Sequence, residues 1–158
     1  MFAPRVGASL YLSRSQDIVV ILLPYTCTLM QVRFSDLDMI GHVSNSNYAS
    51  YFDMGRIDFF KEVEKMSTVK RPHHVVASVK MDMLREIRFD HKVEIATWCS
   101  RVGTKSMTIE HLIFADGEIA TTSQSVLVGF DLKTRRSTPF PTDWAPTDPA
   151  LIPVVPER

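Results

Sequence analysis

Two carboxylates and an imidazole lie close together in one polar stretch of the chain: Asp36, Asp38 and His42. A carboxylate can attack an acyl carbon or remove a proton from water, and an imidazole can orient a substrate. Residues from Tyr48 onward have the spacing of a helix, whose first turn offers free amides and the positive end of the helix dipole. Those amides can polarise a carbonyl oxygen while a carboxylate acts on its carbon. These residue types in this order suit the hydrolysis of an activated acyl group.

Each of these side chains also has a structural interpretation. Asp38 could stabilise a turn, because aspartate is common in loops. His42 either positions a substrate or holds the loop together. Asn45 either orients water or the acyl group, or caps the helix. Tyr48 belongs to the core, unless its hydroxyl faces a pocket at the helix start, and the residues alone leave these alternatives open.

The central element predicted by the sequence is a long amphipathic helix after the polar stretch. Its apolar residues recur at helical spacing, which places them on one face: Tyr48, Tyr51, Phe52, Gly55, Phe59 and Val63. Because Gly55 lies on this face, we expect another element to approach the helix closely there. Ser46 or Asn47 is expected to cap the helix start. Asp53 and Arg56 are three residues apart, so either they pair on the helix or Asp53 is a second acidic candidate for catalysis.

Five segments have the composition of β-strands. One, at residues 26–34, precedes the polar stretch, and four follow the helix, at residues 75–85, 92–102, 106–115 and 118–132. Asp116-Gly117, between the last two, is a strong hairpin signal. The short connections require antiparallel neighbours, and the helix must bury its apolar face against the sheet. We therefore expect an α+β domain in which one antiparallel sheet wraps around one long central helix.

The polar stretch and the helix together carry a longer motif, Asp-x-Asp-x-x-Gly-His-Val-x-Asn-x-x-Tyr, followed by an aromatic-rich helix with an Asp-x-Gly-Arg cluster. Its residues are Asp36, Asp38, Gly41, His42, Val43, Asn45 and Tyr48, then Tyr51, Phe52, Asp53, Gly55 and Arg56. In this region the chain resembles the 4-hydroxybenzoyl-CoA thioesterase-like family of hotdog thioesterases. Residues 81–90 resemble that family's second strand and the turn after it. The resemblance extends over about residues 26–132.

Three positions differ from the family pattern. Ser44 replaces the first asparagine of a pair, Asp53 replaces the commoner glutamate, and Gly55 replaces alanine. The change at Ser44 affects the hydrogen bonding expected within the loop. None of the three alters the carboxylate that the family uses for catalysis.

The resemblance implies a single hotdog domain and an acyl-CoA thioesterase that hydrolyses an acyl thioester to a free acid and coenzyme A. The family's catalytic carboxylate is the second aspartate of the motif, which corresponds to Asp38 as base or nucleophile, while Asp36 shapes the loop. His42, Asn45 and Tyr48 would then bind or position the substrate. No metal and no cofactor are expected. Whether the leaving group is coenzyme A or an acyl-carrier protein is left open.

The resemblance also implies a homodimer in which two sheets join edge to edge and each site is built from both chains; family dimers often stack into tetramers. A single curved sheet has an unpaired edge, and such edges tend to be covered. Basic residues after the last strand are candidates for contacts with the phosphates of CoA, although side chains at a strand end are often simply solvated. They are Lys133, Arg135 and Arg136.

Two other functions fit the same fold. A hotdog hydratase or dehydratase for enoyl thioesters also pairs an aspartate with a histidine, as Asp36 and His42 could do. Its motif carries a proline between the two, which this loop lacks. The other function is a non-catalytic acyl-CoA-binding protein, which would have lost the catalytic acid, whereas Asp38 is present. The Gly-x-Ser-x-Gly motif of serine hydrolases does not occur.

The composition argues against several classes of protein. The chain has 158 residues, with 18 basic and 18 acidic side chains, and so lacks the basic excess of a general nucleic-acid binder. Its longest apolar run, residues 18–23, is too short to span a membrane. Cys27 and Cys99 are too few for a disulfide framework, which indicates reduced thiols in the cytoplasm. Because the start of the chain is basic, serine-containing and free of acidic residues, an organellar presequence stays open.

The composition also divides the chain into three parts. Residues 1–25 form an N-terminal extension that is expected to be disordered or to pack as an extra strand. Residues 26–137 form the thioesterase domain. Residues 138–158 contain six of the nine prolines. Since proline removes a backbone donor and disfavours helix before it, we expect this tail to be extended over the surface or partly disordered.

Overall fold

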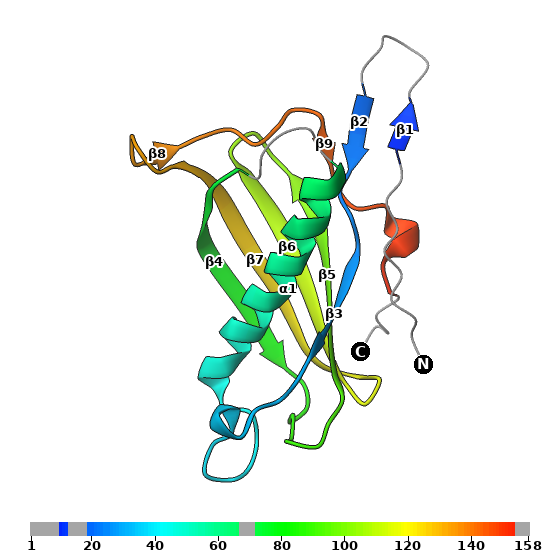
Figure 1. Cartoon of the computed structure of the whole chain (residues 1–158), viewed down its shortest axis with the longest axis vertical. Coiled ribbons are helices and arrows are strands. Elements are labelled where there is room, and N and C mark those ends of the chain that lie inside the picture. Colours follow the sequence, from blue (N-terminus) through cyan, green and yellow to red (C-terminus); the bar gives the residue numbers. More distant parts are fainter. Residues whose placement is uncertain (1–9, 13–18, 67–71, 154–158) are drawn as a thin grey trace.

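In the computed structural model, which describes residues 10–12, 19–66 and 72–153, one six-stranded sheet curls around a long helix (Figure 1). The helix, α1, spans Asn45–Met66. The strands follow the spatial order β3-β5-β6-β7-β4, β8 pairs with the end of β7, and every pair is antiparallel. Their bounds are Thr26–Met30 for β3, His74–Met83 for β4, Val93–Val102 for β5, Ser106–Ala115 for β6, Glu118–Asp131 for β7 and Arg136–Ser137 for β8.

This architecture confirms the predicted α+β domain with an antiparallel sheet around one central helix. Each of the five predicted strand segments contains a strand. The first is shorter than predicted, because β3 ends at Met30 and a short 3-10 helix, η1 (Phe34–Asp36), follows it. The Asp116-Gly117 hairpin also forms, and both of its residues have positive φ angles.

The start of α1 differs from the prediction. Ser46 and Asn47, the predicted caps, lie inside the first turn, since the helix begins at Asn45. The side-chain amide of Asn47 instead donates to the carbonyl oxygen of Asp36 at 2.9 Å and to the hydroxyl of Ser44 at 3.0 Å. This side chain therefore fastens the preceding loop to the helix.

The apolar face of α1 is buried against the concave side of the sheet. Its N-terminal half packs in one cluster, whose aromatic members are Tyr48, Tyr51 and Phe52. Its C-terminal half packs in another, with Phe59, Phe60 and Val63. Between the two halves, a Cβ atom added to Gly55 would lie only 2.6 Å from Thr97 Oγ1. The helix backbone thus approaches β5 closely at the glycine, as predicted.

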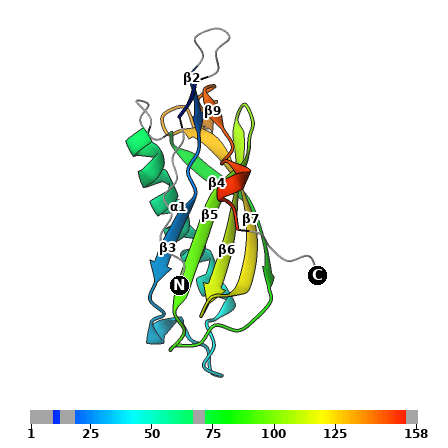
Figure 2. The same ribbon diagram turned by 90° about the vertical axis from the view of Figure 1, so that its right-hand side faces the viewer.

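A second, smaller sheet joins segments from the two ends of the described chain (Figure 2). Ile21 and Leu23 come before the large sheet and Phe140 and Trp144 after it, and all four are buried with the C-terminal half of α1. Segments on both sides of the 26–137 domain therefore share one apolar cluster, and the predicted division stays a prediction. The strands are β1 (Leu10–Leu12), β2 (Val19–Leu22) and β9 (Trp144–Ala145), with β2 parallel to β9.

The outer face of the large sheet, which points away from α1, carries its own apolar group. Trp98 and Leu112 are buried there, and the ring of Tyr25 stacks on that of Trp98. Ile152, which follows the short helix η2 (Pro149–Leu151), packs against the same group. The last described segment of the chain therefore covers part of the outer face.

Strand β4 forms one edge of the large sheet. None of its side chains is buried, and among the described residues no strand pairs with its outer side. Two apolar residues of α1, Met54 and Ile57, are exposed as well. The exposed apolar residues along β4 are Val75, Val76, Val79, Met81 and Met83.

Candidate active site

The polar loop before α1 is organised around Asp36, which is buried. Its Oδ2 atom accepts hydrogen bonds from the hydroxyl of Tyr51 and the amide of Arg33, both at 2.9 Å. Its carbonyl oxygen accepts from the amide of Ser44 and the side chain of Asn47, also at 2.9 Å. Asp36 thus ties both ends of the loop to the helix, a structural role in line with the resemblance.

Asp38 lies on the exposed side of the same loop, at the start of a tight turn. Its Oδ1 atom accepts hydrogen bonds from the amides of Ile40 at 2.9 Å and His42 at 3.1 Å. The amide of Asp38 in turn donates to the carbonyl of His42 at 2.8 Å, and Gly41 supplies the positive φ of 81° that the turn requires. One carboxylate oxygen is therefore fixed, and no described residue donates a hydrogen bond to the other.

His42 continues this turn and contacts a residue from another segment. Its Nε2 atom lies 2.8 Å from Oε2 of Glu86, in the loop after β4, and Glu86 also pairs with Arg88. The amide of Val43 donates to the carbonyl of Ile87 at 2.8 Å, which joins the two segments through their backbones. Nothing in the sequence pattern points to Glu86, because it lies far from His42 along the chain.

The first turn of α1 lies at the same end of the molecule. Asn45 is its first residue and is exposed. Tyr48 is buried one turn into the helix. Burial raises the pKa of its hydroxyl, the hydroxyl of Thr121 opposes this rise, and the negative charge of Asp38 adds to it. Tyr48 and Asp38 are thus close enough to interact electrostatically. The start of the helix and the Asp38 carboxylate therefore occupy one region.

The structure places four of the predicted site residues together at this end: Asp38, His42, Asn45 and Tyr48. The predicted phosphate contacts lie elsewhere, at the turn between β7 and β8 at the opposite end of the sheet (Figure 1). Strand β7 has 14 residues and connects the two ends, a length of roughly 40 Å. Within one chain, three basic residues therefore do not reach Asp38: Lys133, Arg135 and Arg136.

The second acidic candidate, Asp53, forms an ion pair with Arg56, as the three-residue spacing suggested. Arg56 is buried and donates a hydrogen bond to Ser125 Oγ at 3.3 Å. Burial lowers the pKa of its guanidinium, while the charge of Asp53 opposes this change. Asp53 therefore compensates a buried positive charge, which distinguishes it from Asp38.

A buried polar pair lies beneath Gly55. Thr97 Oγ1 and His111 Nδ1 are 3.0 Å apart, and the imidazole of His111 stacks on the ring of Phe52 at 5.2 Å between centroids. Burial lowers the pKa of His111 to about 3, and the positive charge of Arg56 lowers it too. This histidine is neutral near pH 7 and belongs to the packing between helix and sheet.

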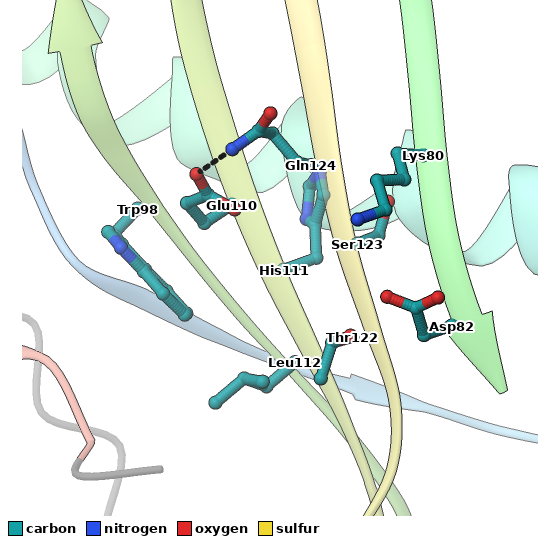
Figure 3. Close-up of a pocket in the computed structure, with 9 residues that line it drawn as sticks. All are labelled: Lys80, Asp82, Trp98, Glu110, His111, Leu112, Thr122, Ser123 and Gln124. Atoms are coloured by element: carbon teal, nitrogen blue, oxygen red, sulfur yellow. Dashed lines mark hydrogen bonds between the residues drawn. The ribbon is translucent and has the colours of Figure 1, made fainter. Parts of the chain in front are cut away.

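A cavity of about 300 Å³ lies on the outer face of the sheet, across β5, β6, β7 and β4 (Figure 3). Its polar lining includes Glu110, whose Oε1 accepts a hydrogen bond from Gln124 at 2.8 Å, together with Lys80 and Asp82. Trp98 forms one wall. Because this cavity is on the face away from α1, it is separate from the Asp38 region.

In the described part of the chain, no three His, Cys, Asp or Glu side chains are placed to hold a metal ion. None of the helices in these segments is long and apolar enough to cross a membrane. Cys27 and Cys99 are free thiols, and burial raises the pKa of Cys99 to about 12, so this thiol stays protonated.

Residues 32–147 match the model of a family described as the thioesterase-like superfamily. The chain is similar to a thioesterase from Thermus thermophilus complexed with coenzyme A and Zn, with 33% identity and a TM-score of 0.64 over 74% of this chain and 86% of that one. It is also similar to a predicted thioesterase from Bacillus stearothermophilus, with 28% identity and a TM-score of 0.67 over 75% and 90% of the two chains. A DHNA-CoA thioesterase from Staphylococcus aureus, 23% identical, shares the fold with a TM-score of 0.63 over 73% and 80%.

One curated protein is also similar to part of the chain. The uncharacterized protein YsmA of Bacillus subtilis (strain 168) is 39% identical over 83 residues. This match covers 52% of the present chain and 56% of YsmA. The chain therefore spans about half the length of this curated relative.

Proposed function

Because the chain belongs to the thioesterase-like superfamily, we propose that it hydrolyses an acyl-CoA thioester to the free acid and coenzyme A. The observation that carries this proposal is the carboxylate of Asp38, held by two backbone amides at the end of the molecule where α1 begins. The similar thioesterase from Thermus thermophilus was solved with coenzyme A, which supports CoA as the carrier of the acyl group.

Asp38 is the proposed base or nucleophile. Since Oδ1 is occupied by two amides, Oδ2 acts on the substrate. As a base, Oδ2 removes a proton from water while the water oxygen bonds to the acyl carbon. As a nucleophile, Oδ2 bonds to the acyl carbon, and water then hydrolyses the resulting anhydride. In both routes the carbon–sulfur bond breaks, its electron pair leaves with sulfur, and a proton from water ends on the thiol.

The start of α1 is proposed to stabilise the oxyanion that develops on the acyl group. Its first amides have no partner within the helix, and the helix dipole is positive at this end. Tyr48 keeps its proton, because its hydroxyl pKa is raised by burial, and it is proposed to donate to the substrate. His42 and Asn45 are proposed to position the thioester beside Asp38.

A homodimer is proposed to form through strand β4. Among the described residues, no strand pairs with the outer edge of β4, which could therefore pair with a second copy. Burial of the exposed apolar side chains of β4 in such a dimer would be favourable. In a two-fold antiparallel pairing, the His74 end of one β4 strand would lie beside the Met83 end of the other. This arrangement would bring the β7–β8 turn of the second copy toward the Asp38 end of the first.

The same pairing gives the basic turn a proposed role. His74 pairs with Gly129 near the end of β7, so the β7–β8 turn lies next to the His74 end of β4, at the proposed dimer edge. Three basic side chains of the second copy, those of Lys133, Arg135 and Arg136, would then approach the substrate from the opposite side. There they could bind the negatively charged phosphates of CoA.

The test is thiol release from short, long and aromatic acyl-CoA thioesters by the purified protein and by Asp38→Asn. We expect the wild-type chain to turn over at least one thioester and the variant to lose most of the rate without a change in melting temperature. Asp58→Asn is the matched control, because Asp58 pairs with Lys61 in the middle of α1, away from the proposed site. It is expected to keep wild-type activity.

Other outcomes would redirect the assignment. Equal activity in wild type and Asp38→Asn would keep the thioesterase and overturn the role of Asp38. No thiol release, combined with a rise in melting temperature on adding acyl-CoA, would indicate a binding protein. Hydration of an enoyl-CoA without thiol release would indicate a hydratase. Sedimentation of wild type and of Val79→Lys tests the dimer, because a charge on the β4 edge is expected to shift a dimer to monomer.

A further inference from the structure

We infer that Glu86 is a positioning residue of the active site, which holds the imidazole of His42 in one orientation and one tautomer beside Asp38. This inference rests on the proposed function. It starts from the 2.8 Å contact between Glu86 Oε2 and His42 Nε2.

The contact joins two loops that are fixed to each other independently. Val43, next to His42, donates its amide to the carbonyl of Ile87, next to Glu86, at 2.8 Å. Val43 and Ile87 are both buried, and His42 forms an isolated β-bridge with Arg88. The backbone segments on both sides of the Glu86–His42 contact are therefore anchored in the core. The two side chains interact across a fixed distance between these segments.

Both oxygens of the Glu86 carboxylate are engaged. Oε2 contacts His42 and Oε1 contacts Arg88. A carboxylate held at two points has a defined direction, and His42 must turn its Nε2 atom toward it. The side chains of His42 and Glu86 are 26% and 42% exposed, so the pair adds little to stability. Its effect is therefore on geometry rather than on folding.

The direction of the bond selects the tautomer of the neutral ring. An ionised carboxylate can only accept hydrogen bonds, so Nε2 of His42 carries the proton and donates it to Glu86. Nδ1, the ring nitrogen nearer the backbone, is then left as an acceptor. The same residue donates its backbone amide to Oδ1 of Asp38 at 3.1 Å. Glu86 thereby places a hydrogen-bond acceptor next to the turn that carries the proposed catalytic carboxylate, where it can orient the hydrolytic water.

The kinetic test compares Glu86→Ala, Glu86→Gln, His42→Ala and the double variant on the thioester that the wild type hydrolyses fastest. We expect Glu86→Ala to lower kcat about 10- to 100-fold with KM changed less than about threefold, because orientation rather than binding is lost. Glu86→Gln keeps an acceptor oxygen and is expected to recover much of this loss. In the His42→Ala background, Glu86→Ala is expected to change kcat less than about twofold, since Glu86 acts through His42.

Glu118→Ala is the matched control. Glu118 pairs with Arg85, in the same loop as Glu86, and is an exposed glutamate that forms no ion pair with His42. It is expected to leave kcat unchanged. Losses from Glu86→Ala and His42→Ala that multiply in the double variant would overturn the inference, and so would an unchanged kcat in Glu86→Ala.

A second readout does not depend on activity. Two-bond ¹H–¹⁵N spectra of the histidine rings report which nitrogen carries the proton. The wild type is expected to show the Nε2–H tautomer at His42, and Glu86→Ala a mixture of tautomers. If no thioester is hydrolysed, the proposed function fails while these spectra still decide the role of Glu86, because an unchanged tautomer in the variant would overturn it.

Discussion

Replacing Gly55 with alanine is expected to destabilise the protein, although alanine is the better helix former. In the interior of a helix, alanine is favoured over glycine by about 1 kcal/mol. Here the new Cβ atom would lie 2.6 Å from Thr97 Oγ1 and 3.0 Å from Ile95 Cγ2. Both distances are shorter than about 3.5–4.0 Å, the separation at which contacts between carbon atoms are favourable. The helix or Thr97 must therefore move.

Either movement is costly. Lifting the helix loosens the contacts of its buried aromatic face, and overpacking of this kind typically costs about 1–3 kcal/mol. Rotating Thr97 instead breaks its 3.0 Å hydrogen bond to His111, in a buried region where an unmade bond costs about 1–3 kcal/mol. After subtracting the gain in helix propensity, we expect Gly55→Ala to lower the free energy of unfolding by up to about 2 kcal/mol.

The assay is chemical denaturation of Gly55→Ala, Thr97→Ala and the double variant at one protein concentration. Thr97→Ala removes the closer of the two contacts of the new methyl group and leaves the one to Ile95, so Gly55→Ala is expected to cost less stability in that background than in the wild type. The difference in stability between Ser50→Gly and Ser50→Ala, at an exposed position of the same helix, measures the propensity gain alone. A stabilising Gly55→Ala with the same effect in both backgrounds would refute the close contact as the cause.

Two further predictions concern buried polar groups. Tyr51→Phe removes the 2.9 Å hydrogen bond to Oδ2 of Asp36 and is expected to cost about 1.5–3 kcal/mol of unfolding free energy, seen as a lower denaturation midpoint; an unchanged midpoint would contradict this role of Asp36. His111 has its pKa lowered from the ordinary 6.5 to about 3 by burial, so the unfolded chain binds more protons between these values. Stability should therefore fall as pH drops below 6.5, by up to about 1.4 kcal/mol per pH unit from this group. His111→Gln should show a shallower pH dependence of unfolding free energy, and equal slopes in both proteins would oppose this explanation.

The elements of the fold were predictable because their signals are local. The helical spacing of Tyr48, Phe52 and Phe59 reflects one buried face, and the composition of the strand segments reflects the sheet. Gly55 was informative for the same reason, since a residue without a side chain on a crowded face indicates a close neighbour. The start of α1 was misjudged by a few residues, because Asn47 bonds to the preceding loop rather than acting as the cap.

The candidate site was predictable only in part. Asp38, His42, Asn45 and Tyr48 lie in one short segment, so a local motif could place them together. Glu86 reaches His42 from the loop after β4, and no local pattern indicates that pairing.

The location of the basic turn also depends on information beyond the local sequence. Its place relative to Asp38 depends on the length and direction of β7, which only the assembled sheet defines. The pairing of β2 with β9 likewise joins distant segments.

Helix α1 meets different neighbours at its two ends. Its 22 residues span about 33 Å, with the Asp38 loop at one end and the cluster of Ile21, Phe140 and Trp144 at the other. The rates of amide hydrogen exchange are therefore expected to differ between the two ends of this helix. Protection of the amides in its last turns would report on the packing of the small sheet against the helix. Protection in its first turn would report on the binding of a substrate beside Asp38. A change in the terminal segments could thus loosen one end of the helix while the loop at the other end kept its shape.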